Sequence, residues 1–202
     1  MNIDETTYKV IFIVYTLLLG FLRLLQHLKY RKEKTPLFKV SKSEYVTFVL
    51  AFLGMLIIPL IHISTGWLEM FRMNLPDWAR LSGPVIGVFG LILLWWVHQT
   101  LGSHWAPIPE IEKDHELLMD GPYKYIRHPM YSAFYVFTLG AWLTLSNWLV
   151  GIAGFVAWTI FCRVRITIEE EMMLKEFGSE YQDYMKRAGS LLPKLSRPIR
   201  TK

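Results

Sequence analysis

Two short stretches of the chain hold most of the side chains that could do chemistry. The first, 121–131, reads Gly-Pro-Tyr-Lys-Tyr-Ile-Arg-His-Pro-Met-Tyr and contains three tyrosines, two prolines and an Arg-His pair. The second, 163–171, carries Arg163 and Arg165 and ends in three consecutive glutamates. Cations, carboxylates and aromatic faces together can bind a ligand that carries charges of both signs. If the two stretches meet, they form a candidate active site.

The elements that must position these stretches are long and apolar. Hydrophobic residues make up 52% of the 202 residues, and the mean hydropathy is +0.27. A helix needs ~20 apolar residues to cross the hydrocarbon core of a membrane. Five segments approach that length: 8–28, 45–64, 81–100, 129–145 and 148–168. We therefore predict an all-α integral membrane bundle with about five transmembrane helices, forming a single domain over 1–202.

The connection between the fourth and fifth spans brings the two stretches together. A connection as short as Ser146-Asn147 requires a tight antiparallel helical hairpin, whose open end carries both stretches. Beyond the fifth span the chain becomes polar but keeps apolar residues at helical spacing. This pattern predicts a separate amphipathic C-terminal helix at 169–188, which Gly178 would kink.

The distribution of basic residues predicts the orientation in the membrane. The connection 29–44 contains six Lys or Arg residues and two Glu residues, and the positive-inside rule places it in the cytoplasm. With five spans the N-terminus is then outside, and both stretches and the C-terminal helix lie on the cytoplasmic side. Anionic headgroups of membrane lipid account for the net charge of +5, so no nucleic-acid partner is predicted.

Other kinds of site fit the residues less well. His104, His115 and His128 match no common zinc spacing, and the single cysteine, Cys162, offers no thiolate set, so no metal is predicted. The sequence contains no nucleophile elbow and no Gly-rich phosphate loop. A purely structural alternative stays open, in which the Arg-His-Pro sequence only opens a helix and anchors it at the interface.

The order of three motifs makes the chain recognisable. His115-Glu-Leu-Leu-Met-Asp-Gly-Pro-Tyr-Lys-Tyr-Ile-Arg-His-Pro-Met-Tyr131 is followed by Arg165-Ile-Thr-Ile-Glu-Glu170 and then by Phe177-Gly-Ser-Glu-Tyr181. As a set, the motifs closely resemble the isoprenylcysteine carboxyl methyltransferase family and its phospholipid N-methyltransferase relatives. The resemblance covers about 100–193, roughly half of the chain, and the small number of spans points to a prokaryotic member.

The resemblance implies a cofactor, S-adenosylmethionine, with S-adenosylhomocysteine as its product. The cofactor site would lie in 101–131 and 163–193, on the cytoplasmic side. The implied cofactor contacts are His115, Leu117, Leu118, Tyr123, His128, Pro129, Met130, Tyr131 and Glu169. The resemblance also implies that Arg165 contacts the methyl acceptor. Glu170 lies beside the implied cofactor contact and could act as a base if the acceptor were an amine.

The predicted reaction is methyl transfer to the carboxylate of a lipophilic substrate such as a C-terminal isoprenylcysteine. An ionised carboxylate needs no general base, so the enzyme only has to align and desolvate it. Three alternatives stay open: phospholipid amine methylation, a membrane sterol-reductase-like enzyme and a non-catalytic membrane protein. Met119 and Ala133 stand where many family members have threonine and glycine, which loosens the assignment of the acceptor.

Overall fold

The computed structural model describes residues 3–29, 41–102 and 117–194, and this part of the chain is built from helices joined by short connections. It contains isolated bridges but no strand. The all-α prediction is therefore confirmed.

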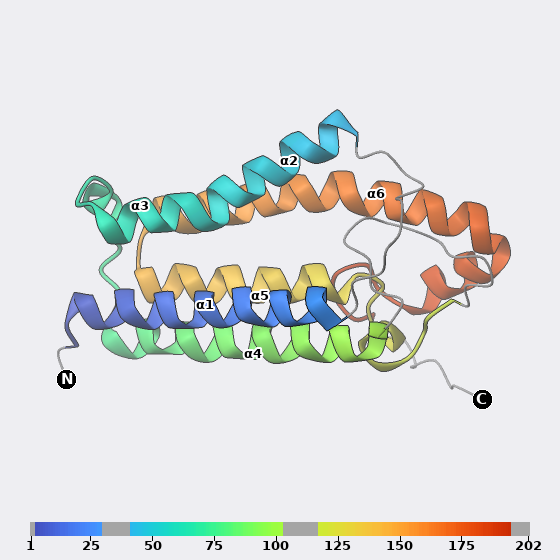
Figure 1. The fold of residues 1–202 in the computed structure, drawn as a ribbon, viewed down its shortest axis with the longest axis horizontal. Coiled ribbons are helices and arrows are strands. Elements are labelled where there is room, and N and C mark those ends of the chain that lie inside the picture. The colour runs from blue at the N-terminus through green and yellow to red at the C-terminus, as the bar shows by residue number, and fades with distance from the viewer. Residues whose placement is uncertain (1–2, 30–40, 103–116, 195–202) are drawn as a thin grey trace.

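The helices form two layers (Figure 1). One layer holds α1 (Glu5–Lys29), α4 (Asp77–Leu101) and α5 (Pro129–Leu145), which pack against one another. The other holds α6 (Trp148–Arg187) beside a continuous rod made of α2 (Lys42–Phe52), the π-helical η1 (Leu53–Ile57) and α3 (Ile58–Ser64). Two short 3-10 turns, η2 (Glu69–Phe71) and η4 (Gly121–Lys124), lie in the connections.

A helix occupies each of the five predicted spans. Among the described residues, four helical rods are long and apolar enough to cross a membrane: Glu5–Lys29, Lys42–Ser64, Asp77–Leu101 and Trp148–Arg187. The fifth, α5, has 17 residues and is shorter. Large apolar side chains stay exposed on these helices, such as Leu17 at 66% and Val85 at 70%. Such surface is stable only against lipid, and the protein is an integral membrane protein.

The predicted hairpin between α5 and α6 is present. Ser146 adopts a left-handed conformation (φ 50°) that ends α5, and Asn147 caps α6 by accepting a hydrogen bond from the Val150 backbone at 3.2 Å. The open end of this hairpin carries the start of α5 and the distal part of α6.

The predicted boundary between the fifth span and a separate C-terminal helix is wrong. The chain stays helical from Trp148 to Gly178, where φ 50° and ψ −119° break the helix. Glutamate, methionine, leucine and lysine, which favour helix, fill 169–175, so nothing ends the helix earlier. The last turns then fold back toward the start of α5 (Figure 1). The glutamates of 169–171 therefore belong to the same rigid helix as the membrane span.

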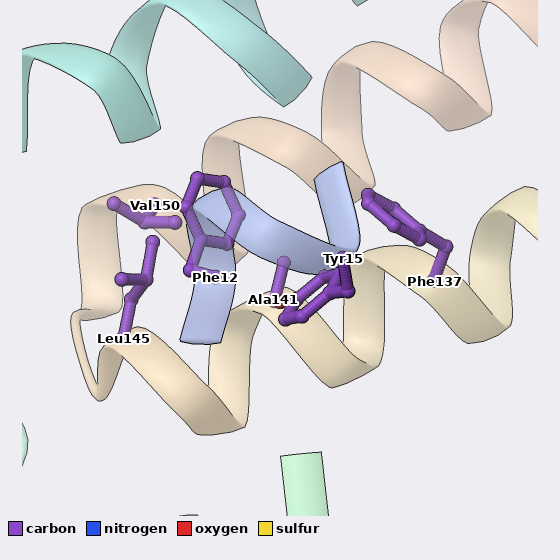
Figure 2. Close-up of a cluster of buried hydrophobic side chains, with 6 residues drawn as sticks. All are labelled: Phe12, Tyr15, Phe137, Ala141, Leu145 and Val150. Carbon is purple, nitrogen blue, oxygen red and sulfur yellow. The ribbon is translucent and has the colours of Figure 1, made fainter. Parts of the chain in front are cut away.

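The core links α1 to the hairpin. Figure 2 shows six buried side chains from α1, α5 and α6 that form one cluster: Phe12, Tyr15, Phe137, Ala141, Leu145 and Val150. At the end of the bundle away from the start of α5, Arg80 donates to both Glu5 oxygens at 2.7 and 2.9 Å and to the Thr144 carbonyl at 3.2 and 3.0 Å. One guanidinium thus ties α1, α4 and α5 together.

Close contact between α4 and α5 depends on glycine. A Cβ atom added at Gly140 would lie 2.6 Å from the Gly87 nitrogen and 2.7 Å from the Gly83 carbonyl oxygen. These neighbours are backbone atoms, which cannot move aside as a side chain could. The small residues set how closely the two helices approach.

We predict that Gly140→Ala lowers the free energy of unfolding by about 1–3 kcal/mol, because the added methyl group overpacks the α4–α5 contact. The matched control is Gly20→Ala, where nothing lies within 4 Å of the added Cβ. That change should be neutral or stabilise α1 by up to about 1 kcal/mol. Thermal unfolding of both variants in the same detergent tests this, and equal melting temperatures for the two would contradict it.

Candidate active site

The segment before α5 pairs with the segment after α6. The Arg127 nitrogen donates to the Gly189 carbonyl at 2.8 Å, the His128 nitrogen donates to Ser190 at 3.0 Å, and the Gly189 nitrogen donates to Tyr125 at 3.0 Å. The Ser132 hydroxyl adds a bond to the Leu191 carbonyl at 2.6 Å. These backbone hydrogen bonds hold Arg127 and His128 next to α6. The two stretches, 121–131 and 163–171, therefore meet at the open end of the hairpin.

Arg127 and His128 both bind Glu170. The Arg127 guanidinium donates to Glu170 Oε1 at 3.0 Å from Nε and 2.7 Å from Nη2, and His128 Nε2 lies 3.0 Å from the same oxygen. Arg127 Nη1 also donates to the Ala188 carbonyl at 2.6 Å. Anchoring a helix at the interface was the structural alternative for Arg127, but in the structure Arg127 joins Glu170 to the chain that follows α6.

Glu169 is the most connected carboxylate of the site. Its Oε1 accepts from the Tyr131 hydroxyl at 2.6 Å and from Arg165 Nε at 3.0 Å, and its Oε2 lies 3.4 Å from His128 Nδ1. His128 thus lies between Glu169 and Glu170, with one ring nitrogen toward each. Six of the residues singled out in the sequence form one continuous network: Arg127, His128, Tyr131, Arg165, Glu169 and Glu170.

A seventh residue of this network, Glu44, was missed by sequence reasoning. Its Oε1 accepts from Arg165 Nη1 at 2.8 Å. Glu44 stands in the first turn of α2, where it forms a capping box with Ser41. The sequence carries the signal of that box, Ser41-Lys-Ser-Glu44, at the start of an apolar span. The residues around Glu44 in the sequence do not indicate that its carboxylate contacts α6.

Aromatic rings pack against the network. The Tyr131 ring stacks on His128 with centroids 5.8 Å apart and meets the Trp158 ring edge-on at 5.9 Å. Trp158 Nε1 also donates to the Tyr131 carbonyl at 3.2 Å. The Tyr123 carbonyl accepts from the Tyr184 hydroxyl at 2.6 Å, and burial together with the nearby Glu169 raises the pKa of the Tyr123 phenol. Tyr123 therefore stays neutral.

The apolar residues expected to contact a cofactor surround the same end. Leu117 packs in a buried cluster with Tyr181, Tyr184 and Ala188, and Leu118 is half-buried. Pro129 is buried in the first turn of α5. The Met130 sulfur lies 3.5 Å from Arg23 Nη1, which brings α1 to the site.

Two of the histidines weighed as metal ligands, His104 and His115, lie outside the described residues, and so does the expected cofactor contact of His115. Within 3–29, 41–102 and 117–194, no three His, Cys, Asp or Glu side chains gather as a metal site.

The charge of His128 follows from its two neighbours. Burial lowers the pKa of the imidazole, but the hydrogen bonds that it donates to Glu169 and Glu170 and their negative charges outweigh burial. The pKa of His128 is therefore raised above its ordinary value of 6.5. A protonated His128 can donate to both carboxylates at once.

Comparisons with known proteins agree with these motifs. The model of the isoprenylcysteine carboxyl methyltransferase (ICMT) family matches residues 84–175. The match agrees with the predicted resemblance over these residues. The matched range includes the Arg-His-Pro motif and both network glutamates of α6.

Two relatives show the extent of the similarity to the ICMT family. Protein-S-isoprenylcysteine O-methyltransferase of Dictyostelium discoideum is 34% identical over 142 residues, which are 66% of this chain and 58% of the relative. The Homo sapiens protein of the same name is 31% identical over 139 residues, 64% of this chain and 49% of the relative. The chain thus spans about half the length of these curated relatives.

A solved structure shares the fold. The eukaryotic intramembrane Ras methyltransferase ICMT aligns with a TM-score of 0.55 and 23% identity, over 84% of this chain and 62% of that chain. This similarity covers more of the chain than the sequence relatives do, so the helices before the motifs also follow the ICMT fold.

The raised pKa of His128 makes stability depend on pH. Because the folded pKa exceeds the unfolded value of 6.5, the stabilisation is fully present below pH 6.5 and is lost as the pH rises through the folded pKa. We predict that the melting temperature of wild type exceeds that of His128→Gln by the largest difference below pH 6.5. This difference in melting temperature should shrink as the pH is raised. Paired melting curves from pH 5.5 to about 9 test this, and a difference that grows with pH would contradict it.

Proposed function

We propose that the protein is an S-adenosylmethionine-dependent methyltransferase that methylates the carboxylate of a lipophilic acceptor such as a C-terminal isoprenylcysteine. The observation that carries the proposal is the Glu169 network, where a carboxylate binds Tyr131, His128 and Arg165 at the end of a membrane helix. Two relatives that are 34% and 31% identical to this chain are named protein-S-isoprenylcysteine O-methyltransferase.

The residues fit S-adenosylmethionine group by group. When bound, this cofactor supplies an electrophilic methyl group on a sulfonium. Glu169 already binds a phenol, an imidazole and a guanidinium, so it suits the ammonium of the cofactor. His128 or Arg127 suits its carboxylate, and the rings of Tyr131 and Tyr123 suit the sulfonium or the adenine.

Arg165 is the proposed contact of the acceptor. Its guanidinium is 11% exposed and lies between Glu169 and Glu44. A planar guanidinium can hold one oxygen of an acceptor carboxylate while the other oxygen faces the methyl group. The protein then has to align the acceptor carboxylate with the methyl group and exclude water, since an ionised carboxylate needs no base.

The surroundings of Glu170 favour a carboxylate acceptor over an amine. An amine acceptor would need a base, and Glu170 was the candidate. In the structure Arg127 and His128 both donate to Glu170 Oε1. Hydrogen bonds to the ionised form make a carboxylate a weaker base. Glu170 is thus better suited to hold His128 and Arg127 in place than to accept a proton.

The position of the site explains a lipid-tailed acceptor. The network lies where the membrane helices end, so a prenyl chain can stay in the bilayer while its carboxylate reaches Arg165. Each buried methylene of such a tail contributes ~0.8 kcal/mol. The basic connection at 29–44 supports a site on the cytoplasmic side and an N-terminus outside.

The direct test uses the purified full chain in lipid, S-adenosylmethionine with a labelled methyl group and farnesylated N-acetylcysteine. We expect label to appear as methanol released by base, because only a carboxyl methyl ester gives that product. Label that enters the lipid fraction without base-labile methanol would instead show amine methylation. No transfer to either acceptor would contradict the proposal.

Glu169→Gln should abolish or strongly weaken cofactor binding, because it removes the charge that pairs with the ammonium. The matched control is Glu171→Gln, which changes an exposed glutamate two positions along the same helix and should bind as wild type does. Isothermal titration with S-adenosylhomocysteine measures both. Unchanged binding by Glu169→Gln would remove Glu169 from the cofactor site.

Arg165→Lys should keep cofactor binding but lower transfer by about 10²-fold, because lysine keeps the charge and loses the planar fork that aligns a carboxylate. The matched control is Arg163→Lys, at an exposed position one half-turn earlier. Initial rates and cofactor titrations of both variants test the assignment. Loss of cofactor binding in Arg165→Lys would show that Arg165 acts on the cofactor instead.

A further inference from the structure

Glu44 connects the start of α2 to the proposed acceptor site. One of its oxygens, Oε2, accepts from the Ser41 backbone nitrogen at 3.0 Å, and the other, Oε1, accepts from Arg165 Nη1 at 2.8 Å. Both side chains are nearly buried, with exposures of 9% for Glu44 and 11% for Arg165. The helices that carry them, α2 and α6, lie side by side (Figure 1).

The capping box alone does not require this contact. A capping box needs one carboxylate oxygen for the backbone nitrogen and is complete without a partner on another helix. Burying an ion pair carries a desolvation cost that the attraction of the two charges barely offsets. The buried Glu44–Arg165 pair is therefore weak support for stability, and a role in orienting Arg165 explains it better.

Arg165 is held from two sides by carboxylates of different helices. Glu169 binds Arg165 Nε from the same helix, one turn along, and Glu44 binds Nη1 from α2. Glu169 has two further partners, Tyr131 and His128. Under the proposed function, on which this step rests, Glu169 also takes the ammonium of the cofactor. Within 3–29, 41–102 and 117–194, the Glu44 carboxylate bonds only to Arg165 and to its own helix cap.

We infer that Glu44 is a positioning residue for methyl transfer, which fixes the direction of the Arg165 guanidinium toward the methyl acceptor. Glu44 thus acts on the site from α2, although it lies 121 positions before Arg165 in the chain. Glu44 acts through Arg165 and does not touch the reacting atoms.

Glu44→Gln separates this role from the helix cap. Glutamine keeps the amide oxygen that a capping box requires, but it removes the charge that holds Arg165. We expect transfer to fall by about 10- to 100-fold, as for a misaligned reacting group, while the dissociation constant of S-adenosylhomocysteine stays within about twofold. The assay is the base-labile methanol assay with the full chain in lipid.

Ser41→Ala is the matched control. It removes the hydroxyl that accepts from the Glu44 backbone nitrogen at 3.2 Å and leaves the Glu44–Arg165 pair in place. We expect a lower melting temperature with transfer close to that of wild type. If Ser41→Ala loses as much transfer as Glu44→Gln, the effect comes from the helix cap and the inference is overturned.

A double-mutant cycle gives the readout that a purely structural role would not change. If Glu44 acts through Arg165, then Glu44→Gln should lower transfer much less in an Arg165→Lys background than in wild type. Equal fold losses in both backgrounds, or full transfer by Glu44→Gln, would overturn the inference while leaving the proposed function intact. Absence of transfer by wild type would instead overturn the proposed function, and this inference with it.

Discussion

Two glutamates, Glu169 and Glu170, lie on α6 just after its apolar stretch, and the arrangement of the site follows from their charge. A carboxylate that leaves water must find hydrogen bonds and opposite charge, since an isolated buried charge costs several kcal/mol. Glu169 finds Tyr131, Arg165 and His128, and Glu170 finds His128 and Arg127. The partners come from the segment before α5, from α5 itself and from α6. The two carboxylates thus hold the open end of the hairpin together.

The rest of the fold makes that convergence possible. The Ser146-Asn147 turn sets α5 antiparallel to α6. The glycine contacts between α4 and α5 allow these two helices to pack closely. At the opposite end, Arg80 joins α1, α4 and α5 through Glu5 and a backbone carbonyl. Both ends of the bundle are therefore fixed by buried guanidinium groups, and the apolar surface between them faces lipid.

Sequence patterns predicted the features that depend on residues close together in the chain, namely the helices and the hairpin. Apolar runs of span length located the helices, and a two-residue connection located the hairpin. The meeting of Arg127 and His128 with Glu169 and Glu170 then followed from geometry. Contacts between distant elements could not be predicted in the same way. Glu44 looks like a helix cap in the sequence, and only the packing of α2 on α6 brings it to Arg165.

The continuity of α6 was missed for a related reason. A change from apolar to polar residues at 169 reads as a boundary, because polarity marks the end of a membrane span. Backbone conformation follows helix propensity instead, so α6 continues to Gly178, whose φ of 50° breaks the helix. Polarity therefore reports where the helix leaves the membrane, and glycine reports where it ends.

The balance of charge at the site bears on the kind of acceptor. Three carboxylates, Glu44, Glu169 and Glu170, face Arg127, Arg165 and a histidine whose pKa is raised, so the network is close to neutral when His128 is protonated. A sulfonium cofactor carries two positive charges and one carboxylate, and it would add one net positive charge. An ionised acceptor would cancel that charge in a region of low dielectric, where an unbalanced charge is costly. The network proposed to bind the cofactor would therefore favour an acidic acceptor, and Arg165, which donates to Glu44 at 2.8 Å, is the cation proposed to receive it.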